Sequence, residues 1–246
     1  MKLQNVKGSM DFLPNEQIIR NKIIKILSDT FVEYGYLPVE TTTLCYYDLL
    51  ASKYAGGAEI LKEVYKLKDQ GERDLALRYD LTVPFAKYIA SNASVRLPYK
   101  RYEIGKVFRD GPIKKGRTRE FIQCDVDCVG VEGQMIETEL ISIFVEGYKK
   151  LGIDIIIKYN NRKLMNGIIE VCNISKDKIC EVITIIDKIE KLSEQELIKE
   201  FNEIGLKENQ IQNLFKYLKM EFNELNSNFK DTLNLNLKEF RLLSFQ

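Results

Sequence analysis

The pattern of apolar positions predicts a chain of helices and antiparallel strands. Apolar residues recur at helical spacing over 15–34, and Gly35 ends that run. Four further amphipathic stretches predict helices: 46–53, 82–90, 134–151 and 160–172. Four short runs predict strands, the middle two as a hairpin around 69–71: 36–42, 64–67, 74–77 and 153–158. This order lacks the regular β-α-β alternation of a parallel sheet, so it indicates an α+β fold with an antiparallel sheet flanked by helices.

The second part of the chain has a different pattern. After about Ile174 the strand-like runs disappear and charged, helical segments follow. Ser193 and Glu196 have the spacing of a capping box before a helix that ends near Gly205. Another helix is expected over 206–222. We therefore expect two domains, an α+β domain over 1–173 and a small all-helical domain over 174–246.

The segment 100–127 carries an unusual set of polar side chains. Two strand-like runs flank a loop with Gly111, Pro112 and Gly116. Alternate residues of the second run fall on opposite faces of a sheet. One face is apolar, with Ile122, Cys124, Val126 and Cys128. The other face carries Arg119, Phe121, Gln123, Asp125 and Asp127. A sheet that only packs on a core does not need this polar set, whereas a ligand with several charges does.

Basic residues surround the loop between the two runs. Arg109 precedes it, Lys114 and Lys115 lie at its tip, and Arg117 and Arg119 follow. The guanidinium group keeps its charge and binds phosphate through two parallel hydrogen bonds. Two arginines on either side of the loop are therefore suited to a triphosphate or its transition state. The alternative is a solvated hairpin tip, and it applies most to the two lysines.

Gln123 and Asp127 are candidates for binding a small ligand. They lie four positions apart on one strand face, so their Cα atoms are roughly 13 Å apart. An amide and a carboxylate at this separation suit the two ends of a cationic or zwitterionic molecule. The alternative is a buried salt bridge to Arg109 or Arg119. Phe121 lies on the same face and is suited to stacking on a purine, or to simple core packing.

Asp80 lies where a strand meets the helix expected over 82–90. It is either the N-cap of that helix or a partner for the amine of a ligand. The sequence contains no phosphate-binding P-loop, no GxGxxG motif and no metal-binding motif. We therefore expect no metal ion held by protein side chains.

Composition narrows the class of protein. The 246 residues are 45% hydrophobic and carry a net charge of +1, which gives no global attraction to nucleic acid or to a membrane. The chain has no histidine, which excludes histidine bases and histidine metal ligands. Five cysteines without a CxxC pair indicate buried thiols rather than a zinc site or disulfides. No signal peptide or membrane-spanning run is visible, so a soluble, cytoplasmic protein is expected.

Taken together and in order, these motifs resemble the class II aminoacyl-tRNA synthetase core, and specifically the histidyl-tRNA synthetase family. The resemblance covers nearly the whole chain. The segment VKGSMDFLP at 6–14 is similar to the family's N-terminal KGTRDFLP, and 31–44 resembles motif 1, the dimer-interface element. The segment LRYDLTVPFAKY at 77–88 resembles the first histidine-binding segment, and 107–127 resembles motif 2. The segments 159–164 and 186–191 resemble those around a helical insertion.

The resemblance implies a role for each candidate residue. Asp80 and Thr82 would contact histidine, and Gln123 and Asp127 would complete the amino-acid pocket. Arg109 would be catalytic, because it would hold both the α-phosphate of ATP and the substrate carboxylate.

The same resemblance implies ATP as a substrate with its Mg²⁺ and tRNA-His as a partner. Arg117 would reach the outer phosphates and Phe121 would stack on adenine. Lys114 and Lys115 would contact the acceptor stem. The motif 1 region would form a homodimer, and no membrane partner is expected.

The chain also departs from the family pattern. Gly111 stands where motif 2 usually has a glutamate that contacts adenine. The second histidine motif, motif 3 and the anticodon-binding domain have no match, so the chain alone is expected to be weakly active or inactive. Two alternatives remain open. One is a non-catalytic paralogue, the regulatory subunit of ATP phosphoribosyltransferase, and the other is a stand-alone binding fragment or sensor. The presence of Arg109, Gln123 and Asp127 beside a basic hairpin favours the ligase.

Overall fold

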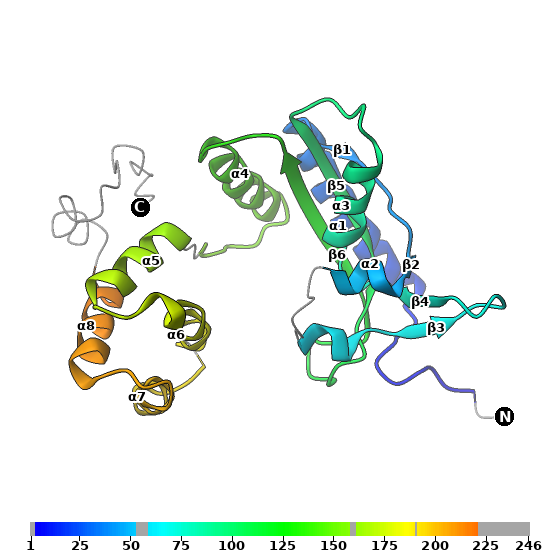
Figure 1. Cartoon of the computed structure of the whole chain (residues 1–246). Coiled ribbons are helices and arrows are strands. Elements are labelled where there is room, and N and C mark those ends of the chain that lie inside the picture. The colour runs from blue at the N-terminus through cyan, green and yellow to red at the C-terminus, as the bar shows by residue number, and fades with distance from the viewer. Residues whose placement is uncertain (1–2, 53–58, 158–160, 190, 221–246) are drawn as a thin grey trace. The chain divides into compact units, whose positions relative to one another are not determined.

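The computed structural model describes residues 3–52, 59–157, 161–189 and 191–220 (Figure 1). The chain divides into two compact units, Met1–Ile157 and Lys158–Gln246. The first unit is α+β, and the described part of the second is helical. The division lies before the boundary expected after residue 173, because the helix α5 (Arg162–Val171) packs with the helices that follow it.

The main sheet of the first unit has three strands, in the order β1-β5-β6. The long strands β5 (Tyr99–Phe108) and β6 (Glu120–Val129) are antiparallel, as the alternation predicts. The short strand β1 (Leu37–Pro38) pairs with β5 in parallel, so the sheet is mixed rather than purely antiparallel. The β5–β6 register places Arg101 opposite Asp127 and Gly105 opposite Gln123.

Two helices cover one face of this sheet (Figure 1). They are α1 (Pro14–Glu33) and α4 (Met135–Lys150). Their core contains Phe31, Tyr36 and Ile143, and the β6 residues that pack against it are Cys124, Val126 and Cys128. This confirms that these alternate positions of β6 face the core. Burying such side chains stabilises the folded state by roughly 25 cal/mol for each Å² of apolar surface removed from water.

A second, antiparallel sheet of the first unit has the order β2-β4-β3. Its strands are β2 (Leu44–Tyr46), β3 (Lys66–Lys68) and β4 (Asp74–Leu77). The helices α2 (Tyr47–Ser52), η1 (Glu59–Glu63) and α3 (Thr82–Ser91) belong to the same region. The backbone of Arg78 connects both sheets, because its N–H donates to Thr43 and its carbonyl accepts from Phe108. This connection sets the start of α3 beside the end of β5.

The second unit contains α5, η2 (Lys176–Lys178), α6 (Ile179–Ile186), α7 (Glu194–Glu203) and α8 (Glu208–Leu218). Fourteen buried residues form the core of the described part of this unit. Asn161 caps α5 by accepting hydrogen bonds from the first turn. The capping box between Ser193 and Glu196 is present at the start of α7, as predicted. Gly205 follows α7 with φ +77°, a left-handed conformation that glycine adopts without strain.

Some expectations from the sequence are wrong. The described residues 153–157 form no strand, and Ile156 is 88% exposed. A β-branched run forms a strand only where another strand can pair with it, and the described residues provide none here. The strand expected over 36–42 shortens to β1, although the N–H of Val39 still donates to the carbonyl of Tyr102. Cys180 is exposed rather than buried. The end of the helix expected over 206–222 lies outside the described residues.

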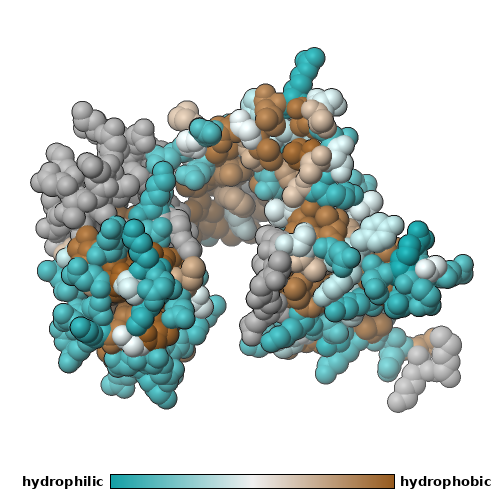
Figure 2. Space-filling view, in the orientation of Figure 1, coloured by the Kyte–Doolittle hydropathy of each residue, from teal (hydrophilic) through white to brown (hydrophobic). Residues whose placement is uncertain are grey.

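Apolar side chains are exposed on both helices that cover the main sheet. On α4 they include Phe144, Val145 and Tyr148, in a region where Figure 2 shows hydrophobic residues in brown. On α1 they include Ile18 and Ile19, which are more than half exposed. A groove of about 550 Å³ is lined by residues of both helices.

Candidate functional site

The face of the main sheet that is turned away from the helical core carries the polar residues expected from the sequence. Phe121, Gln123, Asp125 and Asp127 alternate with the core-facing positions of β6, and all four are half-buried. The register sets Val107, Gly105, Glu103 and Arg101 of β5 opposite them. The structure therefore brings the predicted ligand residues of β6 together with a buried arginine and a buried glutamate of β5.

Asp127 forms an ion pair, but its partner differs from both expected arginines. Its Oδ2 lies 2.5 Å from Nη2 of Arg101, rather than beside Arg109 or Arg119. Arg119 instead pairs with Asp110 at 2.9 Å. Asp127 is only half-buried, so its carboxylate joins a buried charge network to the open face of the sheet.

The junction between β4 and α3 forms a second wall of the site. Asp80 is buried, and its Oδ1 accepts a hydrogen bond from the backbone N–H of Val83 at 3.1 Å. This is a capping interaction at the start of α3. Thr82 is the first residue of α3 and is exposed. Arg109 Nε donates to the carbonyl of Tyr79 at 3.0 Å, so the predicted catalytic arginine is held at the same junction.

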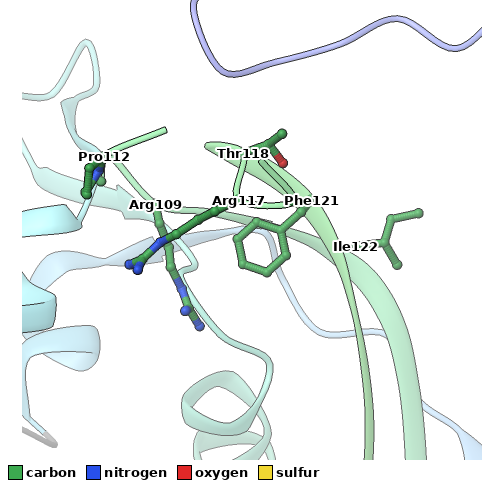
Figure 3. A pocket seen from close by; sticks show the side chains of 8 residues that line it. Arg109, Pro112, Arg117, Thr118, Phe121 and Ile122 are labelled. Atoms are coloured by element: carbon green, nitrogen blue, oxygen red, sulfur yellow. The ribbon is translucent and has the colours of Figure 1, made fainter. Parts of the chain in front are cut away.

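A cavity of about 530 Å³ lies at the loop end of the hairpin (Figure 3). Arg109, Arg117 and Phe121 line it, together with Gly111, Pro112, Gly116, Thr118 and Ile122. The guanidinium carbon of Arg109 lies 5.3 Å from the centre of the Phe121 ring, a cation–π distance. Two guanidinium groups beside one aromatic ring can accept the phosphates and the base of a nucleotide.

Lys114 and Lys115 do not line this cavity. Both are exposed at the hairpin tip, where Lys114 and Arg117 form an isolated backbone bridge. Gly116 closes this turn with φ +75°. The tip therefore presents basic side chains to solvent, beside the cavity rather than inside it.

Glu63 was not identified from the sequence, although it contacts two residues of the hairpin, Asp110 and Arg117. Its carboxylate lies 3.3 Å from Nη2 of Arg117, and its carbonyl accepts from the N–H of Asp110 at 2.7 Å. A Cβ at Gly111 would lie 2.8 Å from the same carboxylate, so a larger residue there would require the Glu63 side chain to shift. No sequence signal connects Glu63 with Arg117, because the two are 54 positions apart.

The N-terminal segment also contacts the hairpin. The carbonyl of Gly8 accepts from the N–H of Arg119 at 2.8 Å. Gly8 has φ +90°, and a Cβ there would lie 2.8 Å from the side chain of Arg119. Glycine is therefore required at this close approach, which explains why a glycine occurs in a segment far from the hairpin in sequence.

The carboxylates of the site make it suited to a positively charged group. Burial raises the pKa of Asp125, and the negative charges of Asp127 and Asp80 raise it further, against the opposing charge of Arg101. Gln123 Oε1 is buried and has no hydrogen-bond partner among the described residues. Burying an acceptor without a partner is costly, so Gln123 Oε1 can accept a hydrogen bond from a donor of a ligand or of water.

Neither a metal site nor a membrane span is found in the described part of the chain. No group of three or more histidine, cysteine, aspartate or glutamate side chains there is arranged to hold a metal ion. No helix among these residues is long and apolar enough to cross a membrane.

The chain is similar to known proteins over nearly all of its length. The family model of histidyl-tRNA synthetase matches residues 8–240. Histidine–tRNA ligase 1 of Bacillus cereus is 57% identical over 208 residues, which are 85% of this chain and 48% of that protein. Histidine–tRNA ligase of Helicobacter hepaticus is 39% identical over 218 residues, 87% of this chain and 49% of that protein. The chain therefore spans about half the length of these relatives.

Solved structures give the same relationship. The histidyl-tRNA synthetase of Nostoc sp. PCC 7120 has a TM-score of 0.82 and 27% identity, over 98% of this chain and 56% of that one. A Bacillus halodurans protein, described as an ATP phosphoribosyltransferase regulatory subunit/histidyl-tRNA synthetase, shares the fold. Its TM-score is 0.79 at 19% identity, over 97% of this chain and 62% of that one. The fold and the family model agree with the motifs in the sequence: the chain belongs to the histidyl-tRNA synthetase family.

Proposed function

We propose that this chain provides the ATP- and histidine-binding walls of a histidine–tRNA ligase. One observation carries the proposal. Arg109 lines the nucleotide-sized cavity, and its hydrogen bond to the carbonyl of Tyr79 holds this cation beside the residue that precedes Asp80. A cation in this position suits the two reacting groups of adenylate formation, a phosphate and a carboxylate.

The proposed reaction has two steps. In the first, a carboxylate oxygen of histidine bonds to the α-phosphorus of ATP, and the bond to the β-phosphate oxygen breaks. Pyrophosphate leaves with the Mg²⁺ that ATP carries. In the second, a terminal hydroxyl of tRNA-His attacks the activated carbonyl and AMP leaves. Catalysis of the first step depends on holding the reactants and stabilising charge, with Arg109 beside the α-phosphate. It requires no histidine base, so the lack of histidine is compatible with it.

The remaining residues bind the substrates in this proposal. Arg117 contacts the outer phosphates and Phe121 stacks on adenine, since both line the cavity beside Arg109. Histidine lies against the polar face of β6. Asp80 and Thr82 contact it from one side, and Gln123 and Asp127 contact it from the other side.

The other parts of the proposal concern partners. Lys114 and Lys115 contact the acceptor stem of tRNA-His from the exposed hairpin tip. The second unit corresponds to the family's helical insertion. Exposed apolar residues in the motif 1 region, Val32, Leu37 and Leu44, support a homodimer contact there. The protein acts in the cytoplasm, where its substrates are.

The test is histidine-dependent exchange of pyrophosphate into ATP. It is measured for the 246-residue chain and for a chimaera in which residues 8–218 replace the matching part of the Bacillus cereus relative. We expect exchange by the chimaera and little or none by the chain alone, because the chain spans about half of the relative. Arg109→Ala in the chimaera should lower kcat by roughly 10²–10³-fold, the usual effect of losing a transition-state charge contact.

Two outcomes would contradict the ligase. One is a folded chimaera without exchange beside an active Bacillus cereus parent. The other is exchange that does not depend on Arg109. Binding to an ATP phosphoribosyltransferase in place of exchange would favour the regulatory subunit instead.

A further inference from the structure

Arg101 is a buried cation that contacts both walls of the proposed amino-acid pocket. Its side chain is 0% exposed. On one side its Nη2 lies 2.5 Å from Oδ2 of Asp127 on β6. On the other side the same nitrogen donates to the carbonyl of Leu81 at 3.3 Å, between Asp80 and Thr82. One guanidinium group therefore joins the strand and the helix start that carry the proposed histidine contacts.

The guanidinium group of Arg101 is held from two further directions. Its Nη1 lies 3.5 Å from Oε2 of Glu103, and its central carbon lies 4.2 Å from the centre of the Phe85 ring. The carboxylate and the aromatic ring limit the orientations that the Arg101 guanidinium group can adopt.

Glu103 is itself fixed by its neighbours. It is 2% exposed and accepts hydrogen bonds from the N–H of Thr41 at 3.0 Å and from Nη1 of Arg78 at 2.8 Å. A buried carboxylate with several donors does not reorient at low cost. The position of Arg101 therefore depends on packing and not on the ligand.

Charge gives Arg101 a second effect on the pocket. Asp80, Asp125 and Asp127 face the same region, and the first and last of these raise the pKa of Asp125. The positive charge of Arg101 has the opposite effect and lowers the pKa of Asp125. Without this cation the three carboxylates would repel one another, and Asp127 would lose the partner that orients it. Arg101 thus sets both the direction of the Asp127 carboxylate and the separation of the two walls.

From this geometry we propose that Arg101 is a positioning residue for histidine binding. It acts through Asp127 and through the start of α3, and it does not touch the substrate. The inference rests on the proposed function, since it assigns Asp127 and Asp80 to the amino-acid pocket. Arg78 also pairs with Glu103 and is buried, but its side chain donates hydrogen bonds to Thr41, Glu103 and Lys106. Of these two arginines, Arg101 is the one that forms an ion pair with Asp127 on β6.

The kinetic test uses Arg101→Lys and Arg101→Met in the chimaera. We expect the KM for histidine to rise about tenfold or more in Arg101→Met, while the KM for ATP stays within about twofold. The KM of Arg101→Lys for histidine should lie between those of the parent and Arg101→Met, because lysine keeps the charge but lacks the two-pronged guanidinium group. The matched control is Lys100→Met. Lys100 directly precedes Arg101 in β5, but it pairs with Glu139 on the helical face, at 2.7 Å.

Combining Arg101→Met with Asp127→Asn distinguishes an effect of Arg101 through Asp127 from a general disturbance of the fold. If Arg101 acts through Asp127, the second substitution should add little to the KM for histidine, since interacting residues are not additive. A parent chimaera without exchange would contradict the ligase itself. An active parent whose Arg101 variants change neither KM, or change both equally, would overturn only the role of Arg101.

A second measurement does not depend on activity. Crystal structures of the 246-residue chain and its Arg101→Met variant should differ in the Asp127 carboxylate or in the carbonyl of Leu81. If Arg101→Met does not fold, Arg101→Lys replaces it. A variant with both groups unmoved would overturn the inference, whatever the exchange assay gives.

Discussion

The guanidinium group of Arg78 lies directly over Gly105. A Cβ at position 105 would clash with Nη2 of Arg78. Arg78 cannot move aside at low cost, because its Nε donates to the carbonyl of Lys106 at 2.9 Å and its Nη1 to that of Thr41 at 2.7 Å. The absence of a side chain at Gly105 therefore lets the buried charge network cross between the two sheets, opposite Gln123.

Gly105→Ala should lower the free energy of unfolding by about 1–3 kcal/mol, the usual cost of overfilling a packed site. Urea denaturation followed by circular dichroism measures it. Gly71→Ala is the matched control, because a Cβ there meets Asp69 at 3.4 Å, an ordinary contact. Equal losses in the two variants would contradict the packing argument.

Arg117→Met should weaken ATP binding with little effect on stability. Arg117 lines the cavity, and its side chain is 52% exposed where it pairs with Glu63. An exposed pair contributes about 0–1 kcal/mol, so the unfolding free energy should hardly change. The KM for ATP in the chimaera should rise by about tenfold, since a charge-assisted phosphate contact is worth more than an exposed ion pair.

The control for Arg117 is Lys106→Met, another exposed cation of the hairpin. Lys106 pairs with Glu120 at 2.6 Å and does not line the cavity. An unchanged KM for ATP in Arg117→Met, or an equal rise in both variants, would argue against a phosphate contact.

The raised pKa of Asp125 predicts that stability falls as the pH rises. Burial is the main cause of the shift, from an ordinary value of 3.8. Just above that value the unfolded chain has lost the proton while the folded chain still holds it. The folded state then binds more protons, so the free energy of unfolding decreases with pH until the raised pKa is passed.

Asp125→Asn should remove this decrease. The variant should gain stability relative to the parent between pH 4 and pH 7, measured by urea denaturation across that range. Asp154→Asn, at an exposed position, should follow the parent. A parallel pH dependence for Asp125→Asn and the parent would show that this carboxyl does not titrate as expected.

The cysteines should differ sharply in reactivity. Cys180 is exposed, whereas burial raises the pKa of Cys124 and of Cys172 to about 11. A thiol reacts through its thiolate, so at pH 8 one fast-reacting group is expected in the folded chain. An aromatic disulfide reagent with absorbance readout measures this. Cys180→Ser should abolish the fast phase, and a remaining fast phase would indicate that the burial of another thiol is wrong.

Local sequence patterns determined the elements and their faces. The alternation in β6 identified the polar face with Gln123 and Asp127, because side-chain direction in a strand has a period of two. The spacing of Ser193 and Glu196 identified the start of α7, because a capping box is closed within one helical turn. These features depend on residues a few positions apart. The family motifs could likewise be recognised from the sequence, because they occur along the chain in the family's order.

Only the tertiary structure decided which partners meet. Asp127 pairs with Arg101 and not with Arg109 or Arg119, because the β5–β6 register brings Arg101 opposite it. Glu63 reaches Arg117 across 54 positions, which no local pattern encodes. The apolar run beginning at Ile153 has the composition of a strand but forms none in its described part, since a strand requires a neighbour. The sequence alone determined which side chains share a face, whereas long-range packing determined the buried charges that hold them in place.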